Sequence, residues 1–149
     1  MTENPFYVYN NEALVIAVIQ KILKINNPID IGRLFILTSF FLYDKVALDP
    51  IIKDYVYFKD YLNRQAKIIA QFPKIHIELQ PIILNALTLM MESESIKISD
   101  YNIISVNDDE MNCYQCNRLD NIEEVMPYVF QLTNKLTNRQ LYDYLNIQL

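Results

Sequence analysis

The stretch from Leu34 to Tyr43 is the feature that most constrains how this chain folds. It reads Leu-Phe-Ile-Leu-Thr-Ser-Phe-Phe-Leu-Tyr, so it is apolar on every side of a helix, and Arg33 and Asp44 bound it. A helix needs about 20 predominantly apolar residues to cross a bilayer, and this segment is shorter than that. Because a helix that is apolar all round must be surrounded by other elements, we predict a buried central helix over residues 30–44.

The composition argues against several classes of site. The chain has 149 residues, of which 52% are hydrophobic, and this is ample for one core, so we predict a single domain over residues 1–149. Its only glycine is Gly32, whereas P-loops and Rossmann fingerprints need several glycines where the backbone approaches a phosphate. The chain also has only one histidine and two cysteines. We therefore predict a protein that is not an enzyme and that uses no cofactor.

The N-terminal residues and the charge distribution indicate the compartment and the kind of partner. The first residues have neither the basic segment nor the apolar run of a secretory signal, so we expect a cytoplasmic protein without membrane contact. The net charge is −5; residues 1–91 carry 9 basic and 8 acidic side chains, and residues 92–149 carry 4 basic and 10 acidic ones. An anionic C-terminal part repels nucleic acid and suits a basic protein partner.

Helical periodicity predicts a helical core over about residues 10–92. A first helix is expected to begin at Asn10 or Asn11, which can serve as its N-cap, and to end before the break at Asn26-Asn27-Pro28. Asp30 can then cap the central helix.

Two further helices are expected before residue 92. Asp49-Pro50 should open a short helix that leads into an amphipathic stretch, and this stretch should stop near Phe72-Pro73. A long apolar helix is predicted over residues 75–91, where Pro81 is tolerable only near the first turn.

The pattern changes to period two after residue 95. Hydrophobic and polar residues alternate on both sides of Asp100-Tyr101, which predicts a β-hairpin over about residues 95–106. C-terminal helices are expected over about residues 120–147, with Asn138 as the cap of the last one. Helices followed by a helix pair and a hairpin are the element order of a winged helix. The predicted fold is therefore mainly α, compact and winged-helix-like.

The helix after Pro73 is a poor match to a DNA-recognition helix. Such a helix should present Arg, Lys, Asn or Gln to base edges and further basic residues to phosphates. The segment from Glu78 to Ser95 contains no basic residue and ends with Glu92 and Glu94. We therefore expect no direct sequence-specific DNA binding, and a protein surface is the better match to this helix.

The motif Cys113-Tyr114-Gln115-Cys116 has three interpretations. Ordinary cysteines are the first, zinc shared across a dimer or with a partner is the second, and a redox pair is the third. Structural zinc takes four ligands, and apart from His76 the chain offers no further histidine or cysteine. An acidic loop precedes the pair, which disfavours a low thiol pKa. We favour the first interpretation and predict no metal site within one chain.

Other candidate residues each have a structural and a functional interpretation. His76, flanked by two isoleucines, is predicted to be a partly buried polar group near a helix start, because no nucleophile is evident for it to activate. Asp108-Asp109-Glu110 is favoured as a solvated acidic loop over a cation site, since it lacks the spacing and glycine of an EF-hand. The eleven tyrosines include possible interface anchors, although four of them are equally suited to fixing helix ends: Tyr7, Tyr9, Tyr55 and Tyr57.

Taken as a whole, the pattern over about residues 8–106 resembles a known family. The resemblance rests on five segments, which are Glu12–Ile16, Arg33–Tyr43, Phe58–Leu62, Ile82–Leu87 and Ile96–Ile98. They are similar to the small middle components of bacterial ABC three-component systems, the class that includes Lamassu-type antiphage defence.

The resemblance implies a non-enzymatic middle subunit, or adaptor, in an antiphage defence complex. Its implied partners are an ABC ATPase resembling the structural-maintenance-of-chromosomes (SMC) class and an effector subunit, often a nuclease. The resemblance transfers no catalytic residues. The competing hypothesis from another class is a winged-helix DNA-binding transcriptional regulator, and a third is an enzyme that uses Cys113 or His76.

Overall fold

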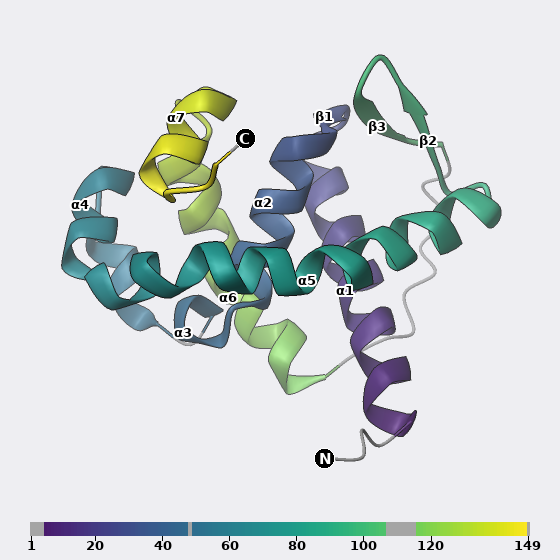
Figure 1. Cartoon of the computed structure of the whole chain (residues 1–149), viewed down its shortest axis with the longest axis horizontal. Coiled ribbons are helices and arrows are strands. Elements are labelled where there is room, and N and C mark those ends of the chain that lie inside the picture. Colours follow the sequence, from purple (N-terminus) through teal and green to yellow (C-terminus); the bar gives the residue numbers. More distant parts are fainter. Residues whose placement is uncertain (1–4, 48, 107–115, 149) are drawn as a thin grey trace.

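The structure is a computed structural model that describes residues 5–47, 49–106 and 116–148. These ranges are mainly helical and include a small three-stranded antiparallel sheet (Figure 1). The predicted combination of a mainly α fold with a short β-hairpin is therefore confirmed. In chain order the elements are α1 (Pro5–Ile25), β1 (Ile29–Asp30), α2 (Ile31–Leu42), α3 (Asp44–Ala47), the 3-10 helix η1 (Pro50–Asp54), α4 (Phe58–Arg64), α5 (Ala66–Glu92), β2 (Ile96–Ser99), β3 (Asn102–Ser105), α6 (Asn117–Thr133) and α7 (Asn138–Tyr144).

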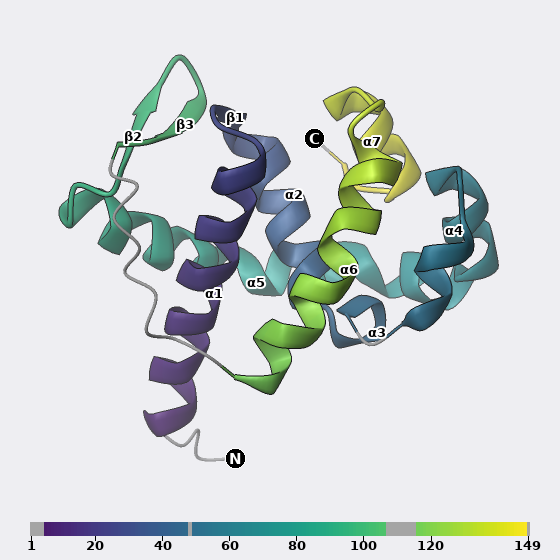
Figure 2. The same cartoon turned by 180° about the vertical axis from the view of Figure 1, so that it is seen from behind.

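The helix α2 lies at the centre of the fold, as its uniform apolar character predicts. Helix α5 crosses it on one side (Figure 1), and α1 and α6 lie on the other (Figure 2). The Asp30 side chain caps α2 by accepting a hydrogen bond from the backbone N–H of Arg33 at 3.0 Å. Phe40 and Phe41 are both buried; the Phe40 ring packs edge-on against Phe72 at a centroid distance of 5.8 Å. The predicted central helix is confirmed.

The helix α5 is continuous from Ala66 to Glu92, so the predicted stop near Phe72-Pro73 and the new start after it are wrong. A proline inside a helix removes one backbone hydrogen bond and costs about 3 kcal/mol. Pro81 is exposed and Pro73 is half-buried, so water can reach freed carbonyl groups on this side of the helix. Burial of the opposite face against α1 and α2 outweighs the two prolines, because packing of an amphipathic face supplies most helical stability.

Other predicted helix boundaries also shift. Helix α1 begins at Pro5, so Asn10 and Asn11 lie inside it and are not its N-cap; proline suits a first helical turn because its φ is already helical. The amphipathic stretch after η1 is not one helix. It is divided at Gln65, whose φ of −106° and ψ of 48° separate α4 from α5.

The C-terminal helices differ from the prediction by a few residues. Helix α6 begins at Asn117, three residues before the predicted region. Thr137, and not Asn138, caps α7: its side chain accepts from the N–H of Gln140, whose own side chain accepts from the N–H of Thr137. This reciprocal capping box satisfies two backbone donors at once.

The predicted hairpin is confirmed, and a third strand joins it. Strands β2 and β3 pair in antiparallel register, and β1 pairs with the other edge of β3, which gives the order β1-β3-β2. Strand β1 has only two residues, too few for a period-two pattern to be visible. The hairpin turns at Asp100 and Tyr101, where φ is 51° and 64°. The carbonyl of Tyr101 accepts a hydrogen bond from the N–H of Ile31 at 2.8 Å, which holds the turn against the start of α2.

Gly32 leaves room for the Tyr142 side chain of α7 beside the start of α2. A Cβ atom at this position would collide with the hydroxyl of Tyr142 on α7. The only glycine of the chain therefore serves close packing and not a turn. In the described ranges, positive φ falls on residues that carry side chains, namely Glu94, Asp100, Tyr101 and Asn146.

Candidate functional site

His76 is buried in the middle of α5, so its predicted place near a helix start is wrong. The error follows from the continuity of α5 through Pro73. The ring stacks on Phe72 at a centroid distance of 5.9 Å, and Nδ1 lies 2.9 Å from the hydroxyl oxygen of Ser39 on α2. Nε2 lies 3.3 Å from the amide nitrogen of Gln80. The Nδ1 contact therefore joins α5 to α2, and the Nε2 contact is made within α5.

The surroundings of His76 favour the neutral ring. Burial lowers the pKa of His76, because an apolar environment disfavours the charged form. The amide nitrogen of Gln80 is a donor, so Nε2 accepts and Nδ1–H donates to Ser39. A general base needs a free lone pair within reach of a substrate proton. The structure gives His76 the contacts of a core residue.

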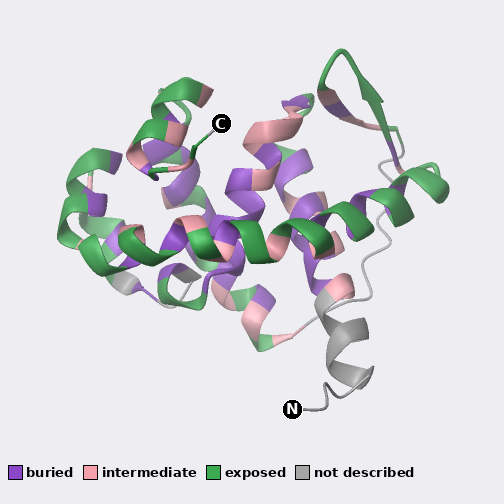
Figure 3. Ribbon diagram, in the orientation of Figure 1, coloured by how far each residue is buried: buried purple, intermediate pink, exposed green. Residues whose placement is uncertain are grey.

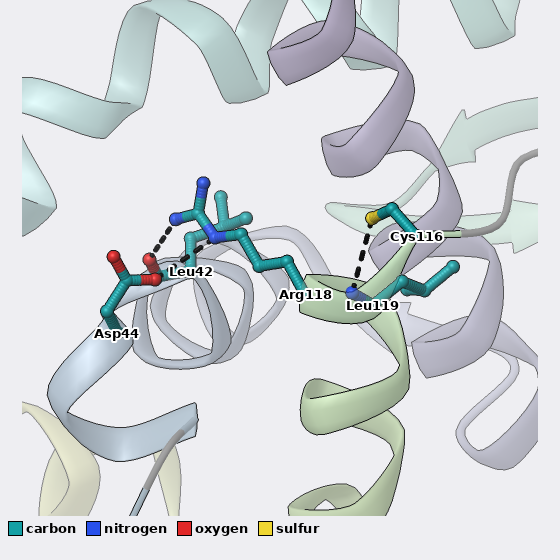
Figure 4. Close-up of polar contacts among 5 residues, drawn as sticks. All are labelled: Leu42, Asp44, Cys116, Arg118 and Leu119. Atoms are coloured by element: carbon teal, nitrogen blue, oxygen red, sulfur yellow. Dashed lines mark hydrogen bonds and ion pairs between the residues drawn. The ribbon is translucent and has the colours of Figure 1, made fainter.

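Cys116 is the N-cap residue of α6 and one member of the predicted Cys113/Cys116 pair. Its sulfur accepts a hydrogen bond from the N–H of Leu119 at 3.4 Å (Figure 4), and the thiol is free and half-buried. Cys113 and the acidic segment Asp108-Asp109-Glu110 lie outside the described residues. Among the residues that the structure describes, no three His, Cys, Asp or Glu side chains group closely enough to hold a metal ion.

Two arginines whose contacts are not recognisable from the sequence hold α6 at both ends. Near its start, Arg118 donates to the carbonyl of Leu42 at 2.8 Å and pairs with Asp44 at 3.0 Å (Figure 4). Beyond its end, Arg33 donates to the carbonyls of Thr133 and Leu136 at 2.6 and 2.9 Å. Cations at the C-terminal end of a helix also interact favourably with its dipole. Both arginines thus fix α6 against α2.

A buried carboxylate joins η1 to α4. Asp49 accepts hydrogen bonds from the N–H of Ile51 at 3.0 Å, the hydroxyl of Tyr61 at 3.1 Å and the amide of Gln65 at 2.9 Å. Burial and the Asp49 carboxylate both raise the pKa of Tyr61. The sequence predicts Asp49 as a helix cap, but its other two donors are not recognisable before the fold is known. Because its carboxylate accepts three hydrogen bonds from groups of the fold, Asp49 has a structural role.

Exposed apolar residues form two tips at opposite ends of α5. The α4 tip is Val56 and Tyr57, where Tyr57 precedes α4 and is 68% exposed. The hairpin tip is Ile98 and Tyr101, where Tyr101 is 81% exposed. Helix α4 joins the N-terminal end of α5 and the hairpin follows its C-terminal end (Figure 1). A 27-residue helix is about 40 Å long, so the tips are well separated.

The backbone at the hairpin tip is strained. A bulky residue with positive φ is uncommon and costs of order 1 kcal/mol or more. Asp100 and Tyr101 both adopt such φ values in a turn that usually contains glycine. Because the Ile31 bond holds the Tyr101 carbonyl, the backbone of this residue is fixed while its ring remains in solvent. Strain of this kind is typical of functional positions.

A further surface feature of the described residues lies along α7. An open depression along α7 is lined by Asn138, Arg139, Tyr142, Asp143, Asn146 and Ile147, and nearly all of its wall comes from this one helix and the residues after it. No helix within the described part of the chain combines the length and the hydropathy that a membrane span requires. The two tips are therefore the candidate functional surfaces.

Comparison with known proteins adds no family to these observations. No protein-family model, no curated protein and no solved structure matches the chain.

Proposed function

We propose that this protein is a non-enzymatic adaptor, the middle subunit that links an SMC-like ABC ATPase to an effector such as a nuclease in a bacterial antiphage defence complex. The sequence resemblance suggests this class of complex. The observation that carries the proposal is the separation of the α4 tip and the hairpin tip by the length of α5. An adaptor needs two contact surfaces that two partners can occupy together, and exposed Tyr57 and Tyr101 are residues of the type that anchors interfaces.

Charge gives the hairpin tip a preferred kind of partner. The segment from Glu92 to Val106, which contains the hairpin, carries three acidic side chains and one basic one. A basic partner surface is complementary to it, and such complementarity increases association rates and specificity. The proposal therefore assigns the more basic partner to the hairpin tip and the other partner to the α4 tip.

Co-purification with the products of the neighbouring genes tests the proposal. The tagged chain should retain both gene products when the three proteins are expressed together in the cytoplasm of a host cell and purified through the tag. Tyr57→Ser should lose one product and keep the other, and Tyr101→Ser should show the converse pattern. Leu89→Ser is the matched control, since Leu89 is an exposed apolar residue of α5 outside both tips and should retain both products.

The pattern of losses separates an adaptor from other arrangements. If both variants lose the same product, the two tips form one docking surface and the adaptor role is wrong. If neither variant loses a product that the unaltered chain retains, the contact surfaces lie elsewhere.

The alternative function is a winged-helix DNA-binding regulator. The sheet order β1-β3-β2 and the hairpin that follows α5 support a winged-helix-like arrangement in which α5 takes the place of the recognition helix. The charges of α5 support DNA binding poorly, because its only basic residues are Lys67 and Lys74, both in its N-terminal third. Glu78 and Glu92 lie along the rest of the helix, where phosphates would be repelled.

A duplex-DNA titration distinguishes the two functions. We predict weak binding that disappears as salt approaches about 0.15 M, because few cations are available to displace counterions. Fluorescence anisotropy with random and promoter-derived duplexes measures this directly. A specific complex that persists at this ionic strength would replace the adaptor with the regulator.

A further inference from the structure

One side of α5 carries a row of exposed, uncharged side chains along the whole helix. Ala70, Ile77, Leu84 and Met91 follow one another at intervals of seven residues; all are exposed, and the last three are 65%, 58% and 45% exposed. Seven residues fall about 20° short of two helical turns, so these residues form a nearly straight row, here called the α5 stripe. Figure 3 shows exposed residues along the α5 surface that faces the viewer.

The position of α5 leaves this surface accessible. Helix α5 runs across the front of the fold in Figure 1 and behind the other helices in Figure 2, so it forms one outer layer of the molecule. Its inner face packs against α1 and α2. Helices that pair in coiled coils place apolar residues at two positions of every seven, and the stripe supplies one of the two. The stripe is therefore suited to a second helix that lies along α5.

The charges of α5 identify that helix. Lys67 and Lys74 lie in its N-terminal third, Glu78 follows with its carboxylate 4.0 Å from the Lys74 amine, and Glu92 and Glu94 lie at the end of the helix and in the turn after it. This order opposes the helix dipole, which favours acidic residues at the start and basic residues at the end. A partner helix should therefore be acidic beside the start of α5 and basic beside its end. A second α5 in the antiparallel direction has this distribution.

We propose that two copies of this chain form a two-fold symmetric dimer by antiparallel packing of their α5 stripes, with Leu84 at the axis. Ile77 of each copy then lies opposite Met91 of the other. Lys74 is ten residues before Leu84, and Glu92, the last residue of α5, is eight residues after it, so at 1.5 Å per residue each Lys74 lies within about 3 Å along the axis of Glu92 of the other copy, with Glu94 in the turn that follows. A parallel dimer would instead place Lys74 beside Lys74 and Glu92 beside Glu92.

The dimer surface is distinct from the two tips. The stripe lies between the tips on α5, and neither Tyr57 nor Tyr101 belongs to it. A dimer of this kind would carry two α4 tips and two hairpin tips. It would thereby double the number of docking sites that the adaptor presents. Loss of the dimer and loss of a docking partner are consequently separate measurements.

Sedimentation of the full-length chain across the micromolar range tests the dimer. The unaltered chain should change from monomer to dimer as its concentration rises. Leu84→Glu should weaken dimerisation about a hundredfold, because it places two like charges at the centre of a desolvated contact. Leu89→Glu is the matched control: Leu89 is also an exposed leucine of α5, but it lies on another side of the helix and should leave the dimer unchanged. Circular dichroism melts verify that each variant folds.

Charge reversal tests the antiparallel direction. Lys74→Glu and the double variant Glu92→Lys, Glu94→Lys should each dimerise about tenfold more weakly, since each sets like charges opposite one another. Mixed together, the two variants should form a heterodimer as tight as the unaltered dimer. A chain that stays monomeric at every concentration overturns the proposal, as does a dimer that Leu84→Glu leaves intact or a mixture that shows no recovery. A monomeric chain that retains another protein through Leu84 would assign the stripe to a foreign partner and would also overturn it.

Discussion

The inner and outer faces of α5 both carry large apolar side chains, which are buried on the inner face and exposed to solvent on the outer face. On the inner face, Ile83 and Leu87 are buried against the helices of the core, and on the outer face Ile77 and Leu84 are mostly exposed. The outer face also carries polar and charged residues such as Lys74, Glu78 and Asn85, so apolar residues at helical spacing serve the core on one side and lie in a mixed, exposed surface on the other. Apolar helical periodicity therefore indicates which side chains favour burial, whereas the tertiary fold determines which of them the chain itself buries.

The largest difference between the buried core and the outer face of α5 should appear when buried side chains of α2 are shortened. Phe40→Ala and Phe41→Ala should each lower the free energy of unfolding by about 3–5 kcal/mol, because both rings are fully buried between α2 and its neighbours. Leu84→Ala on the outer face should change it by less than about 0.5 kcal/mol in the monomer. Urea unfolding at low protein concentration measures all three. Equal effects at Phe40 and Leu84 would remove the distinction between the two regions.

A smaller but still large effect is expected at the polar part of the core. Asp49→Ala should lower the free energy of unfolding by about 2–3 kcal/mol, because it removes a helix cap and leaves the Tyr61 hydroxyl buried without its acceptor. Asp54→Ala, an exposed acid five residues later, is the control and should be nearly neutral. The same unfolding measurement compares them. A neutral Asp49→Ala would mean that the hydrogen bonds of this carboxylate contribute little.

The contact of α5 with α2 should also depend on pH through His76. Burial lowers the pKa of His76 in the folded protein, whereas the unfolded chain has an ordinary histidine pKa of about 6.5. Below that pH the unfolded state binds more protons than the folded state, so stability falls as pH falls from about 6.5 towards the folded pKa. Above about pH 6.5 this contribution to the pH dependence vanishes, because both states are neutral.

Comparison of the unaltered chain with His76→Gln isolates this effect from the titrating carboxylates. Unfolding free energies at about pH 7.5 and about pH 5.5, on either side of the ordinary histidine pKa, should differ more for the unaltered chain than for the variant. If the unfolding free energy changed equally with pH in the two proteins, His76 would bind protons equally in the folded and unfolded states. That result would contradict its burial between Phe72 and Ser39.

The smallest effect is expected at the cysteines. The double variant Cys113→Ser, Cys116→Ser should change stability by less than about 0.5 kcal/mol, because serine at position 116 can accept the same N–H of Leu119 that Cys116 accepts now. Partner binding should be preserved. Metal analysis of the purified protein provides the opposite test: stoichiometric zinc that the double variant loses would establish a shared metal site.

The sequence predicted the parts of the fold that depend on short-range signals. The apolar run before Tyr43 placed α2, the carboxylate of Asp30 marked its start, and period-two alternation around Asp100-Tyr101 located the hairpin. It misplaced features that depend on tertiary packing. Two prolines suggested a helix break that burial of the inner face of α5 overrides, and the same error displaced His76.

The candidate surfaces were harder to predict than the core. Tyr57 is one of the four tyrosines equally suited to fixing helix ends, and its exposure depends on how α4 meets the rest of the chain. Tyr101 was noted only as part of a turn, since neither its positive φ nor its contact with Ile31 is visible in sequence. The α5 stripe has a visible seven-residue spacing, yet a spacing alone does not tell which face the chain covers.

The scarcity of glycine has a consequence for the entropy of the unfolded chain. A chain of this length contains about ten glycines on average, and this one has a single glycine, packed against α7. Each residue that replaces glycine at a compatible position restricts the unfolded ensemble and favours folding by about 0.4–1 kcal/mol. At turns such as Asp100-Tyr101, the positive φ raises the energy of the native state instead. The protein therefore combines strained turns with an unfolded state that has less conformational entropy to lose on folding. Glycine introduced at those turns would relieve the strain of the native backbone, but it would also increase the conformational entropy of the unfolded state.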